Sequence, residues 1–147
     1  MSIRRRGDSP GHCIEYAIGQ CQAAEQAFDE VWCVLDVDQF DINEAERRAG
    51  KHGVALAVSN PCFELWLLLH MVDVGRPFTD CKEVGRALAK VCPGYDKSNL
   101  AFGHFRSGVE KAIDRAKRLE ERCGDRCEPV NPSSGMWRLM ARLVGEG

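Results

Sequence analysis

The chain has 147 residues, and its 44% hydrophobic and 29% charged content is typical of one globular domain and excludes a disordered chain. No apolar run reaches the roughly 18 residues of a membrane span, and no apolar stretch follows the three arginines near the start, so we expect no membrane association, no signal peptide and a cytoplasmic location. The net charge of -2 is unevenly distributed along the chain: residues 1–46 hold three basic and ten acidic residues, and residues 47–147 hold seventeen basic and twelve acidic residues. This distribution suits a cation-binding part beside a phosphate-binding part, or simply helices that differ in surface charge.

The first predicted elements are a helix and a buried strand. Ser9-Pro10 places an N-cap residue before a proline at the first helical position, and apolar residues at helical spacing continue from Ile14 to Phe28. Residues 31–35 form a continuous apolar run of the kind found in strands that are covered on both faces. This strand is expected to end in Asp36-Val37-Asp38.

A second strand is predicted after a short helix. Asp41 and Glu44 have the spacing of a capping box, which opens a helix to about Ala49. Residues 54–58 form the second apolar run, and the turn that follows leads into an apolar helix over residues 62–71. Strand, helix, strand and helix in this order predict two parallel neighbouring strands.

The second half is predicted to be helical. Residues 84–91 carry one apolar stripe, and residues 105–119 carry another with basic side chains on the outside. Ser133 or Ser134 is expected to cap a last helix, which carries apolar residues from 136 to 143.

This order of elements predicts an α/β fold. A small parallel sheet flanked by helices is expected over residues 10–75, and residues 76–147 add a helical extension. Both are assigned to one domain over residues 1–147, because no linker, repeat or low-complexity stretch separates them.

Eight cysteines are present, but no export signal accompanies them. Several, including Cys21, Cys33 and Cys62, fall within apolar patterns, so we expect reduced and buried side chains rather than disulfides. A zinc site at Cys123 and Cys127 is disfavoured, because zinc ribbons have two matched pairs with shorter gaps and no second pair or nearby histidine follows here.

The candidate functional residues lie where the two predicted strands end, because parallel strands end at the same edge of a sheet and ligands collect there. Asp36 and Asp38, one residue apart on an extended backbone, point the same way. Two adjacent carboxylates repel unless a cation lies between them, and such oxygen ligands suit Mg²⁺ or Mn²⁺, which can activate water at a phosphodiester. A solvated acidic loop is the plain alternative. A dehalogenase-type phosphatase, which also uses this motif, has threonine or valine where this chain has Phe40.

The end of the second strand brings further polar groups to the same edge. Ser59 and Asn60 open a turn whose free N–H groups can bind an anion, and Glu64 lies in the first turn of the helix that follows. Most helix N-termini bind only water, and Glu64 would favour the helix dipole in any case. His70, on an almost wholly apolar helix, is expected to be a hydrogen-bonded core residue.

Several strings of this sequence resemble the RloB family. They are residues 31–38, Ser59-Asn60-Pro61-Cys62-Phe63-Glu64-Leu65-Trp66-Leu67-Leu68-Leu69-His70, Pro93-Gly94-Tyr95-Asp96-Lys97, residues 112–121 and Asn131-Pro132-Ser133. The likeness covers nearly everything from about residue 12 onward, and the long string that ends at His70 is its most specific part. RloB proteins are encoded with restriction–modification and other phage-defence loci, and they resemble the TOPRIM-related nucleases of abortive-infection systems.

The resemblance implies a TOPRIM-like sheet and a nuclease that depends on Mg²⁺ or Mn²⁺ and acts on DNA or RNA. Asp36 and Asp38 would be catalytic residues and metal ligands, and Glu64 and Lys97 would be further catalytic residues that position the ion and contact phosphate. The residues expected to bind the nucleic acid are Ser59, Asn60, Arg115 and Arg118.

Two departures from the family pattern bear on function. TOPRIM sites use a glutamate at the end of an earlier strand, and residues 1–11 contain no such strand, so we expect this βα unit to be lacking. The family also tends to have threonine and histidine near the last helix start, where this chain has Ser134 and Trp137. A non-catalytic remnant or binding subunit of a defence complex is therefore the second functional hypothesis. An unpaired edge on the strand at 31–35 predicts a homodimer or a partner protein, unless the first helix covers that edge.

Overall fold

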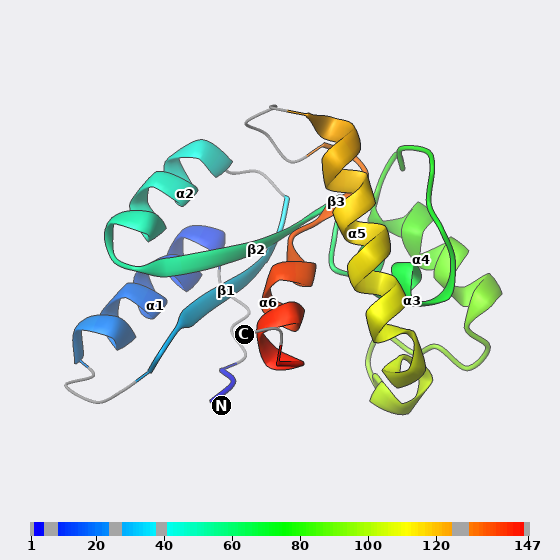
Figure 1. The fold of residues 1–147 in the computed structure, drawn as a ribbon, viewed down its shortest axis with the longest axis horizontal. Coiled ribbons are helices and arrows are strands. Elements are labelled where there is room, and N and C mark those ends of the chain that lie inside the picture. The colour runs from blue at the N-terminus through cyan, green and yellow to red at the C-terminus, as the bar shows by residue number, and fades with distance from the viewer. Residues whose placement is uncertain (1, 5–8, 24–27, 38–40, 125–129, 146–147) are drawn as a thin grey trace. The chain divides into compact units, whose positions relative to one another are not determined.

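The computed structural model describes residues 2–4, 9–23, 28–37, 41–124 and 130–145 (Figure 1). The helices are α1 (Pro10–Ala23), α2 (Ile42–Lys51), α3 (Glu64–Met71), α4 (Cys81–Val91), α5 (Val109–Cys123) and α6 (Met136–Leu143), with two short 3-10 helices, η1 (Phe102–His104) and η2 (Arg106–Gly108). The strands are β1 (Val31–Asp36), β2 (Val54–Asn60) and β3 (Ser133–Ser134). Among these described helices, none is long and apolar enough to cross a bilayer.

The three strands form one sheet in the order β1-β2-β3. β2 and β3 are antiparallel, with Ser59 opposite Ser134 and Asn60 opposite Ser133. The sheet is mixed, so β1 and β2 form its parallel pair, and the predicted α/β class is confirmed. β1 lies at an edge of this sheet, and the homodimer or partner expected to cover it stays a prediction.

The third strand shifts the predicted cap of the last helix: Gly135 occupies the N-cap position, while the Oγ of Ser134, one residue earlier, accepts the N–H of Met136 at 3.4 Å. Both serines are extended, and Gly135 precedes the first residue of α6. The backbone N–H of Gly135 donates to the carbonyl of Val58 at 2.8 Å, so this segment satisfies polar groups on the side of β2 away from β1. A Cβ at position 135 would lie 3.1 Å from the nitrogen of Val58, which explains the glycine at this close approach.

The chain divides into two compact units, and the first comprises Met1–Cys33 and Gln39–Leu56. Its helices α1 and α2 contact each other through their apolar faces, and an ion pair joins Glu15 to Arg48. The predicted N-cap of α2 is confirmed, because the Asp41 side chain accepts the N–H of Glu44 at 3.1 Å. The buried residues of the two helices are Ile14, Ala17, Ile18, Ile42, Ala45 and Ala49.

Two predictions from the sequence, one for Cys33 and one for Phe28, can be checked in this unit. Cys33 is buried and reduced, as expected, and its Sγ lies 3.7 Å from the carbonyl of Cys13. Burial raises the pKa of the Cys33 thiol to about 11. The prediction that the first apolar stripe reaches Phe28 is wrong, because Phe28 is not helical and its side chain is 50% exposed.

The second unit comprises Val34–Asp38 and Ala57–Gly147, and α3 is its central helix. All seven residues from Glu64 to His70 are buried, and α3 contacts α4, α5 and β3. Three of its leucines, Leu65, Leu68 and Leu69, are almost wholly inaccessible, and each contributes about 2–3 kcal/mol relative to an exposed side chain.

His70 is a core residue, as its apolar surroundings in the sequence predicted. Its Nδ1 lies 2.8 Å from the carbonyl oxygen of Trp66, and its ring meets the rings of Trp66 and Phe105 edge to face. Burial lowers the pKa of His70, so the neutral imidazole is the form that suits this core.

The helices α4 and α5 pack on α3 through the predicted stripes. Val84 and Leu88 of α4 are wholly buried, whereas Val91, the last residue of the predicted stripe, is 38% exposed. The predicted stripe of α5 is confirmed in full, and its buried residues are Val109, Ala112, Ile113, Ala116 and Leu119.

Candidate functional site

The ends of β1 and β2 lie side by side, as the parallel arrangement predicted. The N–H of Val37, just after β1, donates to the carbonyl of Ser59 near the end of β2 at 2.8 Å. Ser59 is wholly buried, and its Oγ lies 2.8 Å from the Oγ of Ser134, while Asn60 is half-buried opposite Ser133. Ser59 therefore has a structural hydroxyl–hydroxyl contact.

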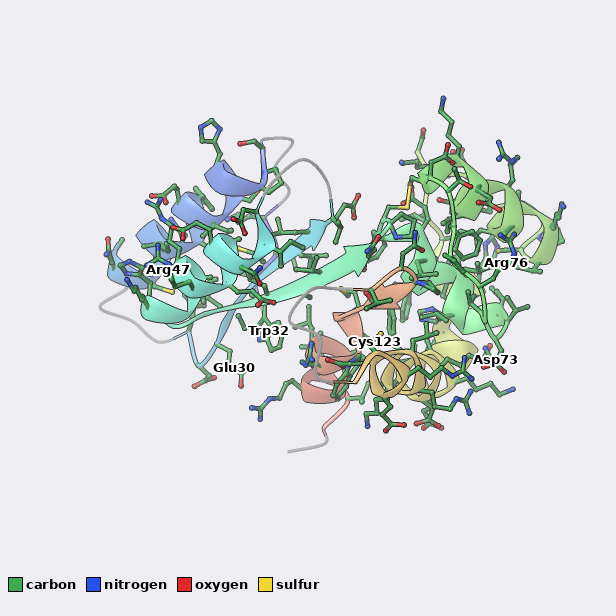
Figure 2. The ribbon with its side chains drawn as sticks, turned by 90° about the horizontal axis from the view of Figure 1, so that it is seen from above. Glu30, Trp32, Arg47, Asp73, Arg76 and Cys123 are labelled. Atoms are coloured by element: carbon green, nitrogen blue, oxygen red, sulfur yellow. A yellow bond between two sulfur atoms is a disulfide. The ribbon has the colours of Figure 1, made fainter. Side chains whose placement is uncertain are left out.

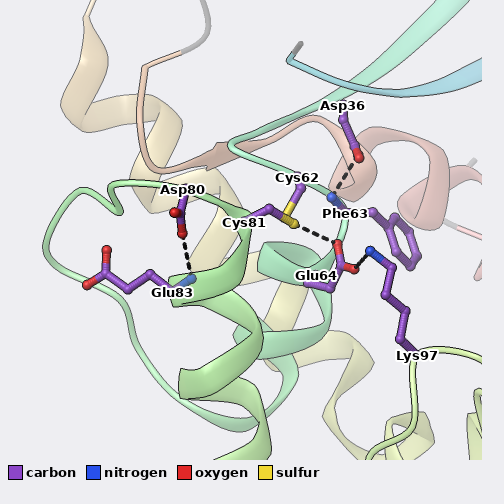
Figure 3. The surroundings of a disulfide bond; sticks show 8 residues. All are labelled: Asp36, Cys62, Phe63, Glu64, Asp80, Cys81, Glu83 and Lys97. Carbon is purple, nitrogen blue, oxygen red and sulfur yellow. Dashed lines mark hydrogen bonds and ion pairs between the residues drawn. A yellow bond between two sulfur atoms is a disulfide. The ribbon is translucent and has the colours of Figure 1, made fainter. Parts of the chain in front are cut away.

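Asp36 lies against the turn that leads into α3. Its Oδ1 accepts the N–H of Phe63 at 2.8 Å, as Figure 3 shows. Phe63 directly precedes α3, so its N–H belongs to the set that has no partner within the helix. The carboxylate of Asp36 therefore takes the place of the anion that was expected at this helix start. The hydrogen bond also orients this exposed carboxylate. Asp38 lies outside the described residues.

Glu64 and Lys97 form an ion pair close to Asp36. The Lys97 Nζ lies 2.6 Å from Oε1 of Glu64, and the Glu64 side chain is 8% exposed while that of Lys97 is 75% exposed. The hydrogen bond to Glu64 and its charge raise the pKa of Lys97, and the nearby charge of Asp36 adds to the rise. Three residues predicted as catalytic, from the end of β1, the start of α3 and the loop after α4, therefore lie together (Figure 3).

Tyr95 also belongs to this group, although sequence reasoning did not single it out. Burial raises the pKa of its phenol, and the charge of Glu64 adds to this effect. Tyr95 lies in the string from Pro93 to Lys97 that resembles the family, but the residue type alone does not distinguish a tyrosine at a functional site from one in the core.

A disulfide joins Cys62 to Cys81 beside this group, which corrects the prediction that Cys62 is reduced. The two Cα atoms are 5.8 Å apart, within the usual range for a disulfide. Cys62 precedes α3 and Cys81 is the first residue of α4, so the packing of these two helices brings them together. The Sγ of Cys81 also lies 3.4 Å from Oε2 of Glu64.

The oxygen ligands here fit a hard cation by their chemistry, because Mg²⁺ and Mn²⁺ prefer carboxylates. Asp36 and Glu64 are such ligands, and Asp38 would be a third. Within the part of the chain that the structure describes, however, the group of three donors that comes within 4.8 Å is Cys62, Glu64 and Cys81, and it does not include Asp36. A complete carboxylate set for Mg²⁺ therefore depends on Asp38.

The two arginines predicted to bind nucleic acid have partners on α3 and in the segment after it. Arg115 donates to the carbonyl of Leu69 at 2.7 Å, and its side chain is 15% exposed. Arg118 lies 2.8 Å from Asp73, which Figure 2 labels beside α5, and is half exposed. Arg115 thus satisfies a carbonyl in the last turn of α3, whereas Arg118 retains the exposure that a phosphate contact needs.

Comparison with known proteins identifies the family. No curated protein and no solved structure matches the chain. The model of the RloB-like protein family matches residues 2–143, a range that includes Asp36, Glu64, Lys97 and both cysteines of the disulfide. The chain therefore belongs to the RloB-like protein family.

Proposed function

We propose that this protein is a Mg²⁺-dependent nuclease of TOPRIM type that cleaves nucleic-acid phosphodiesters in bacterial phage defence. The observation that carries the proposal is the meeting of Asp36, Glu64 and Lys97 at the end of the parallel strand pair. Two carboxylates and an exposed ammonium at this edge are the groups that a divalent cation and a phosphate require. The family's association with phage-defence loci supports the biological setting.

Each side chain has a distinct role in this proposal. A bound Mg²⁺ would stabilise charge on the phosphate and make a water molecule more acidic. Asp36 and Asp38 would hold the ion, and the N–H of Phe63 holds the Asp36 carboxylate in place. Lys97 pairs with the buried carboxylate of Glu64, and its largely exposed ammonium can contact a phosphate oxygen of the nucleic-acid backbone.

A second candidate, a binding subunit without catalytic activity, is favoured by a different observation. Glu64 already has a positive partner in Lys97, and the described carboxylates do not form a group of three. In this case the edge would bind nucleic acid or a defence-system partner without cleaving it. The two candidates differ in whether a divalent cation turns binding into cleavage.

A nuclease assay on the purified chain separates them. Single-stranded DNA, double-stranded DNA and RNA are incubated with Mg²⁺ or Mn²⁺, and cleavage is compared between the wild type, Asp36→Asn and Asp114→Asn. Asparagine at position 36 retains the oxygen that accepts the Phe63 N–H and removes the charge. Asp114, an exposed carboxylate on α5, is the matched control. We expect slow cleavage that Asp36→Asn lowers by at least about 100-fold and Asp114→Asn leaves unchanged.

A metal titration gives a second readout that does not require turnover. Mn²⁺ should bind the wild type more tightly than Asp38→Ala, because two adjacent carboxylates need a counter-charge. Equal weak binding of Mn²⁺ by both proteins would refute the metal site, and cleavage that survives Asp36→Asn would refute the catalytic role of Asp36. Binding of nucleic acid without cleavage under every condition would support the second candidate.

A further inference from the structure

Two cysteines and one buried carboxylate converge between the starts of α3 and α4 (Figure 3). Cys62 is 2% exposed and Glu64 6% exposed, and Cys81 is the first residue of α4. The sulfur atoms and a carboxylate oxygen of these residues all lie within 4.8 Å of one another. The proposed nuclease chemistry uses neither sulfur atom, so it does not explain why this trio of Cys62, Glu64 and Cys81 lies together.

One pair of these donors already has the spacing of ligands on a tetrahedral zinc ion. Zinc binds thiolate sulfur at about 2.3 Å and carboxylate oxygen at about 2.0 Å, so neighbouring ligand atoms on one zinc ion lie about 3.5 Å apart. Oε2 of Glu64 and Sγ of Cys81 are 3.4 Å apart. One of the three ligand pairs is therefore already at its coordination spacing. The two sulfurs, which share a bond in the disulfide, need only to separate once that bond is broken.

The charges around the trio also suit zinc. Two thiolates and the carboxylate of Glu64 carry three negative charges, which one Zn²⁺ and the ammonium of Lys97 would balance. Lys97 contacts Oε1 of Glu64 at 2.6 Å and leaves Oε2 on the side of the sulfurs. Sulfur ligands select zinc and exclude Mg²⁺, so the trio and the aspartates at the end of β1 would take different metals, although Glu64 lies close to both.

We infer that Cys62, Cys81 and Glu64 form a zinc site that exists only when the disulfide is reduced. A dithiol reductant supplies two electrons and two protons, the sulfur–sulfur bond breaks to give two thiols, and the reductant becomes a disulfide. Binding of Zn²⁺ to the two sulfurs then releases the two thiol protons. Three protein ligands leave the fourth tetrahedral position for water or another ligand. In a reducing compartment the metal form prevails, and under oxidation the disulfide does.

Cobalt(II) tests this inference, because it replaces zinc and its bonds to thiolate sulfur give a charge-transfer absorption. The full chain is titrated with Co²⁺ after reduction, and in parallel after oxidation. The reduced wild type should bind one Co²⁺ with this absorption, and Zn²⁺ should displace it. The oxidised wild type and reduced Cys81→Ser should bind at least about 100-fold more weakly, and Glu64→Gln about 10-fold more weakly. Cys123→Ser removes a half-buried thiol outside the trio and should bind like the wild type.

Three results would overturn the inference: no thiolate absorption in the reduced wild type, an absorption that Cys81→Ser retains, or one that Cys123→Ser removes. A second measurement needs no substitution and so holds if Cys81→Ser does not fold. Zn²⁺ should protect Cys62 and Cys81 of the reduced wild type from alkylation, as mapped by mass spectrometry of peptides, and equal alkylation with and without Zn²⁺ would refute the site. Neither measurement depends on nuclease activity, so this inference can fail or hold apart from the proposed function.

Discussion

The sharpest prediction for the packing of α3 concerns Gly108, directly before α5. A Cβ at this position would lie 2.5 Å from the carbonyl oxygen of His70 and 3.0 Å from its Cβ. Carbon and oxygen atoms normally approach to about 3.3 Å, so an alanine would force two backbone segments apart by nearly 1 Å. Overpacking costs about 1–3 kcal/mol, and Gly108→Ala belongs at the upper end because backbone atoms cannot rotate away.

Gly85→Ala is the matched control within the same unit. Gly85 lies inside α4, and a Cβ there would meet no atom within 4 Å, so alanine should stabilise the protein by about 0.5–1 kcal/mol through its helix propensity. Thermal unfolding followed by circular dichroism measures both variants. At about 3–4 °C per kcal/mol, Gly108→Ala should lower the Tm by roughly 6–12 °C and Gly85→Ala should raise it slightly. Equal Tm values for Gly108→Ala and the wild type would refute the close approach of α5 to α3.

Two further predictions concern buried polar groups. Arg115→Ala should lower the free energy of unfolding in urea by about 1.5–3 kcal/mol, because it leaves the carbonyl of Leu69 without its charged donor. Arg118→Ala removes an exposed ion pair and should cost less than about 1 kcal/mol, so equal losses would contradict the structural role of Arg115. Burial raises the pKa of Cys33 to about 11 from an ordinary value of 9.0, so the folded state holds this proton more tightly than the unfolded state does. The resulting stability should be complete below about pH 9 and lost as the pH rises through about 11. Over this range the urea midpoint of Cys33→Ala should therefore decline less than that of the wild type.

Local features of this protein could be predicted from its sequence because they depend on residues close together in the chain. The strands β1 and β2, the N-cap at Asp41 and the buried stripe of α5 follow from apolar spacing and capping chemistry alone. The adjacency of the two strand ends, where Val37 contacts Ser59, followed from one further rule, that parallel strands end at the same edge. The family was also recognisable from the string around Glu64.

The tertiary structure alone decided which side chains of separate helices and loops meet. The bond between Cys62 and Cys81 links residues 19 positions apart, and it depends on how α4 packs against α3. Lys97 was predicted to contact phosphate, yet its partner here is the buried carboxylate of Glu64. β3 is only two residues long, too short for any period in the sequence, and it forms because β2 offers it unpaired backbone groups. Such contacts are selected by the complementarity of surfaces that exist only after the chain has folded, so no local pattern encodes them.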